Sequence, residues 1–170
     1  AQLPANQAAT PDSFDPAANL SVAISDAEGK FSLLNVGSLL RLETIEDFSK
    51  IVVKANQTSS GDYPKIAGNV AIEFGVDGKP VATAASDAVS EIALLPASGN
   101  TVISQGVYYV ALLPSDCSGG ITIEFYKNGE KTDGTYKRFQ KQIVFARSKG
   151  ANCGELITAK GFYIDMVKVS

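Results

Sequence analysis

The sequence lacks histidine and tryptophan, and its 170 residues include only two cysteines. Without histidine, the Ser–His and Cys–His pairs that activate nucleophiles are excluded, as are the usual zinc sites. Basic side chains form no cluster, and the formal net charge is −3. A nucleic-acid surface needs clustered Lys and Arg. We therefore expect no catalytic residues, no metal or other cofactor, and no nucleic-acid partner.

Long apolar runs are also missing, so no segment is predicted to span a bilayer. The chain begins with neither an initiator Met nor a signal peptide, and we expect a processed, exported protein. Its opening, AQLPANQAATPDSFDPAAN, shows no helical or strand periodicity. We predict a flexible N-terminal tether over residues 1–19 and a single domain over residues 20–170. A chain of this length buries about 70% of its unfolded surface, which suffices for one core.

The sequence does contain many turn residues, with 15 Gly and 7 Pro. Between them lie about ten short segments that alternate apolar and polar residues, which is typical of a sandwich of antiparallel strands. One such segment places Val70, Ile72, Phe74 and Val76 on one face before the hairpin dipeptide Asp77-Gly78. A single helical turn is expected at residues 45–50. The predicted fold is an all-β, two-sheet β-sandwich of Greek-key, transthyretin-like or immunoglobulin-like type, with little helix.

The clearest strands lie within residues 107–129, VYYVALLPSDCSGGITIEFYKNG. An apolar run at 108–113 ends at Pro114, and a second strand at 121–126 alternates Ile121, Ile123 and Phe125 with polar residues. We expect these three side chains to face the core. We also expect the two strands to form a central hairpin, continued as a meander by a third strand through residues 139–145.

In that meander Cys117 and Cys153 lie beyond the same end of the sheet. They are 36 residues apart, and a disulfide between them would stabilise the fold by roughly 3 to 4 kcal/mol. The alternative is two separate thiols. A catalytic cysteine is disfavoured, because no His or basic partner lies nearby in sequence to lower the thiol pKa.

Three carboxylates, Glu43, Glu46 and Asp47, lie close together in the sequence. Paired carboxylates perform acid and base catalysis when their spatial separation is right. Exposed acidic residues are far more common, so we interpret this group as solvated surface.

Four segments carry a resemblance to a known family: GVYYVALLP (106–114), GGITIEFY (119–126), FSLLNVGSLLRLE (31–43) and KIAGNVAIE (65–73). Over roughly residues 20–150 the chain resembles the N-terminal domain of the fimbrillin-like proteins of Bacteroidetes, the subunits of type V pili and related surface lipoproteins. The resemblance implies a location at the cell surface or outer membrane, with any membrane contact through a lipid anchor that this chain does not contain.

The resemblance further implies a structural or adhesive protein, a pilus (fimbria) subunit or lipoprotein domain, that assembles by β-strand addition. Its partners would be other fimbrial subunits or surface proteins of host or bacterium. We expect the strand at residues 20–24 to lie at a sheet edge, where its removal would leave a groove. Family pilins have two sandwich domains and are cleaved after an Arg, whereas this chain has room for one domain and has no Arg or Lys before Lys30.

The alternative function is a carbohydrate-binding β-sandwich at the cell surface, because glycan modules share this architecture. Such modules stack sugars on exposed aromatic rings. In a chain without tryptophan, the candidates for such a ring are Tyr63 and Tyr126.

Overall fold

The computed structural model describes residues 1–44, 46–148, 157–159 and 162–167, with the backbone alone described for 132–138 and for the residues after 156. In that part of the chain the fold is all-β, with several sheets and one 3₁₀ turn, η1 (Pro16–Ala18). The arrangement is consistent with a β-sandwich.

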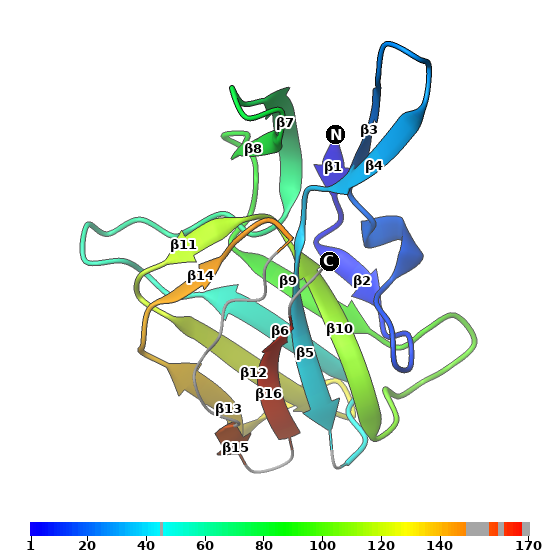
Figure 1. The fold of residues 1–170 in the computed structure, drawn as a ribbon. Helices are drawn as coiled ribbons and strands as arrows, with labels where there is room; N and C mark the ends of the chain where they lie inside the picture. Colours follow the sequence, from blue (N-terminus) through cyan, green and yellow to red (C-terminus); the bar gives the residue numbers. More distant parts are fainter. Residues whose placement is uncertain (45, 149–156, 160–161, 168–170) are drawn as a thin grey trace.

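Two larger sheets form the body of the molecule (Figure 1). The four-stranded sheet has the order β10-β5-β16-β15 and the five-stranded sheet has the order β13-β12-β6-β9-β2. Neighbouring strands are antiparallel throughout, except that β2 runs parallel to β9. The strands of the first sheet are β5 (Ser38–Thr44), β10 (Gly106–Leu112), β15 (Ile157–Ala159) and β16 (Phe162–Val167). Those of the second are β2 (Asn6–Ala8), β6 (Lys50–Ala55), β9 (Glu91–Leu95), β12 (Ile121–Lys127) and β13 (Glu130–Phe139).

Three smaller sheets complete the fold. One joins β1 (Gln2–Leu3) to the hairpin of β7 (Gly68–Phe74) and β8 (Pro80–Ala84). A second is the hairpin of β3 (Ser21–Ser25) and β4 (Phe31–Asn35), and a third pairs β11 (Ser115–Cys117) with β14 (Ile143–Phe145). Both hairpins, β3–β4 and β7–β8, project from the same end of the molecule (Figure 1).

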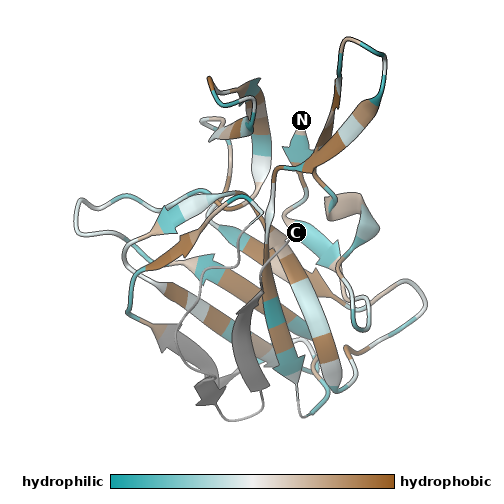
Figure 2. Cartoon of the chain, viewed as in Figure 1, coloured by the Kyte–Doolittle hydropathy of each residue, from teal (hydrophilic) through white to brown (hydrophobic). Residues whose placement is uncertain are grey.

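One hydrophobic core lies between the inward faces of the two larger sheets. On β5 the alternation is strict, with Leu40 and Leu42 buried and Arg41 half-buried on the opposite face. On β12 the expected core residues Ile121, Ile123 and Phe125 are all buried, which confirms that prediction. The Phe125 ring packs against Phe48 with centroids 4.7 Å apart. Figure 2 shows the resulting alternation of apolar and polar bands along the strands.

The predicted central hairpin is wrong. β10 pairs with β5 in the four-stranded sheet, whereas β12 pairs with β6 and β13 in the five-stranded sheet. The connection at Pro114 and β11 therefore crosses from one sheet to the other. Period-2 alternation identifies both strands but carries no information about their hydrogen-bonding partners.

The predicted tether is also wrong. Residues 2–3 and 6–8 form strands, and Leu3, Gln7 and Ala9 are buried. Two residues of one strand are too few to show periodicity, so backbone pairing at this end has no signature in the sequence.

Three local features differ from what their residues suggest. Residues 46–49 form no helical turn; instead Phe48 makes an isolated antiparallel bridge to Ile103. The dipeptide Asp133-Gly134, of a type common in turns, lies inside β13. Phe74 and Val76, the last apolar residues of the alternating segment, are exposed, because the β7–β8 hairpin extends beyond the sheets that would cover it (Figure 1).

Candidate functional site: sheet edges closed by the N-terminal segment

The N-terminal segment, defined here as residues 1–13, lies along the edges of three sheets. β1 pairs antiparallel with β7, so that Gln2 lies opposite Asn69. β2 pairs parallel with β9 at the edge of the five-stranded sheet. Hydrogen bonds from the Ala9 N–H to the Leu95 carbonyl (2.8 Å) and from the Ala93 N–H to the Ala5 carbonyl (2.8 Å) extend this pairing.

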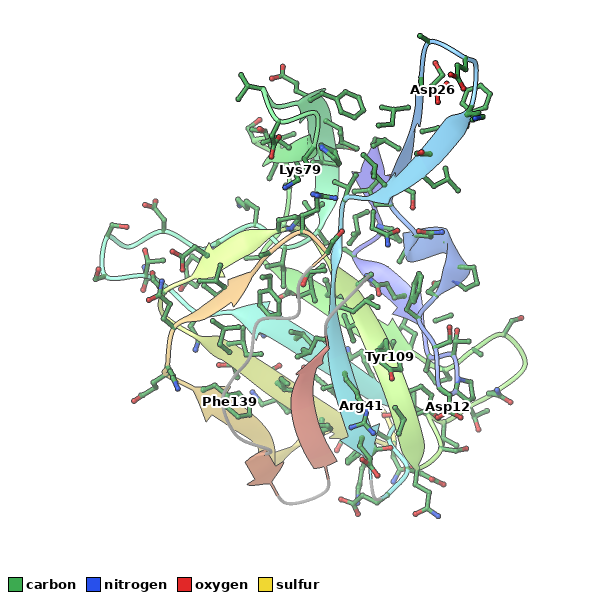
Figure 3. The ribbon with its side chains drawn as sticks, in the orientation of Figure 1. Asp12, Asp26, Arg41, Lys79, Tyr109 and Phe139 are labelled. Carbon is green, nitrogen blue, oxygen red and sulfur yellow. The ribbon has the colours of Figure 1, made fainter. Side chains whose placement is uncertain are left out.

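The same segment also covers the outer edge of β10 in the four-stranded sheet. The Asp12 N–H donates to the Val107 carbonyl at 2.8 Å, and the Tyr109 N–H donates to the Ser13 carbonyl at 3.0 Å. Figure 3 shows Asp12 beside the strand that carries Tyr109. A free sheet edge offers unpaired N–H and C=O groups to any other strand. Residues 12 and 13 satisfy these groups at one end of β10.

At the other end of β10 a side chain takes the place of a strand. The Gln7 amide nitrogen donates to the Ala111 carbonyl at 2.8 Å, and the Gln7 amide oxygen accepts from the Ala111 N–H at 3.0 Å. Gln7 is 1% exposed, and its amide nitrogen also donates to the Pro4 carbonyl at 3.1 Å. A carboxamide carries a donor and an acceptor side by side, so it can complete both bonds of one residue of the strand. Gln7 therefore closes the edge of β10 from a segment that is itself a strand of the opposite sheet.

Asp15 links the N-terminal segment to the 3₁₀ turn η1 that follows it. Its carboxylate accepts from the Ala8 N–H at 2.7 Å and from the Ala17 N–H at 2.9 Å, the second bond capping η1. Beneath η1 an apolar hollow of about 70 Å³ opens against the outer face of β5 and β10. The apolar residues that line it are Phe14, Ala18, Leu20, Leu39 and Ala111.

Ser38 also lines this hollow. Among the described residues its buried hydroxyl has no hydrogen-bond partner. A space of this size exceeds that of one water molecule and, given its lining, suits an apolar group. The hollow and the β10 edge share Ala111, so the two form one continuous site.

The three neighbouring carboxylates of the sequence are not brought together as a catalytic group. Glu43 pairs with Arg41 at 3.2 Å, and Glu46 pairs with Lys127 at 2.6 Å. Asp47 accepts from the Gln105 N–H at 2.9 Å. Each carboxylate has its own partner at the surface, which supports the interpretation as solvated surface.

A fourth carboxylate, Glu124, is buried, and no sequence pattern indicated its burial. It pairs with Lys54 and Lys131, each at 3.2 Å. Burial raises its pKa, but hydrogen bonds and charge from these two ammonium groups outweigh burial and hold the pKa below its ordinary value. Glu124 therefore stays ionised at neutral pH, as a structural ion pair requires.

Cys117 is buried in β11, while Cys153 lies outside the described residues, so their predicted disulfide stays a prediction. Burial raises the pKa of the Cys117 thiol to about 11. A reactive cysteine needs the opposite shift. The Asp77-Gly78 dipeptide forms the expected tight turn, with Gly78 at φ +70° and the Asp77 carboxylate accepting from the Lys79 N–H at 3.1 Å.

The tyrosines proposed for glycan stacking differ in their surroundings. Tyr63 is exposed, whereas Lys50 covers one face of the Tyr126 ring with its ammonium 4.2 Å from the ring centroid. Tyr108 is buried, and its hydroxyl donates to the Ser104 carbonyl at 2.7 Å. A glycan pull-down with Tyr63→Ala and Tyr126→Ala variants tests the alternative function.

Within the described ranges, no group of three or more His, Cys, Asp or Glu side chains is placed to hold a metal ion. No helix in the same part of the chain is long and apolar enough to cross a membrane. The protein-family models contain no match to this chain, and neither the curated proteins nor the solved structures give a significant one.

The sequence analysis missed Gln7 altogether. A glutamine in a segment rich in Ala, Pro and Asn carries no signal of burial, because Gln is usually exposed. Leu3, a large apolar residue isolated in a polar segment, was the signal that could have indicated burial of this segment.

Proposed function

We propose that this protein is a structural or adhesive cell-surface protein, a fimbrillin-like pilus subunit or lipoprotein domain, that assembles by β-strand addition. The observation that carries the proposal is the edge of β10, which is closed by a short segment and a glutamine side chain rather than by a full strand. The two larger sheets would be the layers of a two-sheet, Greek-key sandwich of the kind that the resemblance implies.

In this proposal the N-terminal segment is a replaceable edge strand. Its displacement would uncover the carbonyls of Val107 and Ala111 and the N–H groups of Tyr109 and Ala111. An extended strand from another subunit could pair with all of them at once, and main-chain bonds of this kind supply affinity in strand addition. The apolar hollow beside Ala111 would receive one of its side chains.

This assignment replaces the expectation for residues 20–24. Among the described strands β3 pairs only with β4, in a hairpin separate from the two larger sheets. Its removal would not open an edge of either layer. The segment whose loss uncovers an edge is residues 1–13.

Cell-surface location, export and anchoring through a lipid form part of the same proposal, with other subunits or host or bacterial surface proteins as partners. They rest on the resemblance in residues 31–43, 65–73, 106–114 and 119–126.

A truncation lacking residues 1–13 tests the mechanism. Loss of the buried Leu3 alone removes roughly 1.5 to 3 kcal/mol, and the uncovered β10 edge should promote association. We expect a lower melting temperature, a larger species in light scattering, and recovery of both properties when a synthetic peptide of residues 1–13 is added. If the truncation unfolds, the same peptide should refold it.

The matched controls are two variant peptides. A peptide with Gln7→Ala should rescue poorly, whereas one with Asn6→Ala, which changes an exposed side chain, should rescue like the parent. A truncated chain that stays monomeric with an unchanged melting temperature would contradict the proposal.

A further inference from the structure

The two projecting hairpins carry most of the large apolar side chains that the described chain exposes. On β4 the side chains of Phe31 and Leu33 are 76% and 77% exposed, and the register of the hairpin places them on one face. On the β7–β8 hairpin Phe74, Val76 and Val81 are exposed, and the register places Phe74 and Val81 on opposite faces. Phe31 and Leu33 are neighbours on that face and form a contiguous exposed apolar surface, which is typical of an interaction site, whereas a single exposed apolar residue is ordinary.

The hairpins also carry most of the net charge of the chain. Residues 21–35 and 68–84, which form the two hairpins, contain four acidic side chains, all exposed, and two lysines. The whole sequence contains 18 acidic and 15 basic side chains, so the remaining 14 acidic and 13 basic side chains nearly cancel. Figure 3 labels Asp26 at the tip of one hairpin and Lys79 near the tip of the other. The acidic residues are Asp26, Glu28, Glu73 and Asp77, and the lysines are Lys30 and Lys79.

Both hairpins are joined at their bases by the N-terminal segment. β1 pairs with β7, and the Leu3 side chain lies beside Gly37, in the two-residue link between β4 and β5. Within the described strands, the β3–β4 hairpin makes no pairing with either larger sheet. An isolated two-stranded hairpin is marginally stable in water, so this one gains stability from any partner that covers its apolar face.

From the exposed apolar side chains and the excess negative charge we propose that the two hairpins form a docking surface for a basic polypeptide segment that carries apolar side chains, contributed by another protein.

The excess negative charge of the hairpins determines which kind of partner can bind. A second copy docking through the same end would bring two acidic surfaces together, and like charges across an interface are unfavourable. An anionic lipid surface would be repelled for the same reason. A segment of alternating Lys and apolar residues matches both the charge and the exposed side chains. This surface is separate from the β10 edge, so the inference does not depend on assembly.

The test titrates the full chain with a fluorescent peptide of alternating Lys and Val, and with a matched peptide of alternating Glu and Val. We expect the Lys peptide to bind, with an affinity that falls as salt is added, and the Glu peptide not to bind. Leu33→Ser should weaken binding roughly tenfold, while Val144→Ser, which changes an exposed apolar residue of β14, should leave it unchanged. Glu73→Lys should weaken binding more than Glu130→Lys, which makes the same change of net charge outside the hairpins.

These variants change exposed side chains, and circular dichroism verifies that each is folded. Three outcomes would overturn the proposal. One is equal binding by the Leu33→Ser and Val144→Ser variants. Another is binding of phosphatidylserine vesicles by the native chain without binding of the Lys peptide. The third is self-association of the native chain that Leu33→Ser abolishes, again without peptide binding.

Discussion

Replacing Gln7 with glutamate tests directly whether a side chain closes the edge of β10. The Gln7→Glu substitution keeps the size and shape of the side chain, and one carboxylate oxygen still accepts from the Ala111 N–H. The second oxygen replaces the amide nitrogen, which in the native chain donates to the carbonyls of Ala111 (2.8 Å) and Pro4 (3.1 Å). When ionised, the new carboxylate would therefore set a charged acceptor against two carbonyl acceptors, at a position where the native side chain is 1% exposed.

The size of the effect follows from these contacts. A buried carbonyl that loses its donor costs about 1 to 3 kcal/mol, and a buried charge without a partner costs more. A protonated carboxyl can still donate to the Ala111 carbonyl, so at low pH only the bond to Pro4 is lost, at about 1 kcal/mol. We expect a deficit of about 1 kcal/mol at low pH that grows to roughly 3 to 5 kcal/mol at neutral pH.

The sign of the pH dependence is fixed by the environment of the new carboxyl. Burial and the two carbonyls raise its pKa in the folded state above the unfolded value of about 4.3. The stability deficit of the variant is therefore smallest below about pH 4 and grows as pH rises through the folded pKa, by about 1.4 kcal/mol for each unit by which that pKa is raised.

Urea unfolding of the native chain and the Gln7→Glu variant between about pH 4 and pH 8 measures this difference. Asn6→Asp is the matched control, since it makes the same chemical change at the exposed neighbouring side chain and should show little dependence on pH. A Gln7→Glu variant whose deficit is constant across this range would refute the role assigned to the Gln7 amide.

Three further predictions concern the body of the fold. Gly120→Ala should cost several kcal/mol in thermal unfolding, because its new methyl group would overlap a carbonyl at the end of β13. Gly129 has nearly the same φ, +80°, but faces open space, so Gly129→Ala should cost only about 1 kcal/mol. Equal losses of stability in the two variants would contradict the crowding at Gly120. Ile123→Asp buries an unpaired charge and should prevent folding, and soluble protein with cooperative unfolding would show that its side chain is not in the core. Alkylation of the unreduced chain in denaturant should modify neither Cys117 nor Cys153, and labelling of both would disprove the disulfide.

The sequence predicted the strands of this protein better than it predicted their partners. Alternation placed Ile121, Ile123 and Phe125 in the core, because the period of a strand is a local property. The assignment of β10 and β12 to different sheets depends on contacts between distant residues, which alternation does not encode.

The candidate site was harder to predict, for two physical reasons. The closure of β10 depends on one amide of Gln7, whose burial no local pattern indicates. The projection of the β7–β8 hairpin depends on where neighbouring sheets end. The alternation that ends in Phe74 and Val76 is the same whether that face is covered or exposed.

The placement of the N-terminal segment has a consequence for the order of folding. The partners of this segment lie in β7, β9 and β10, and the Gln7–Ala111 bond spans 104 residues. Contacts of such long range make folding slow, because the chain loses the entropy of loop closure before the contacts form. Until these contacts form, the outer edges of β9 and β10 stay open, and a strand from another molecule competes with residues 1–13 for them.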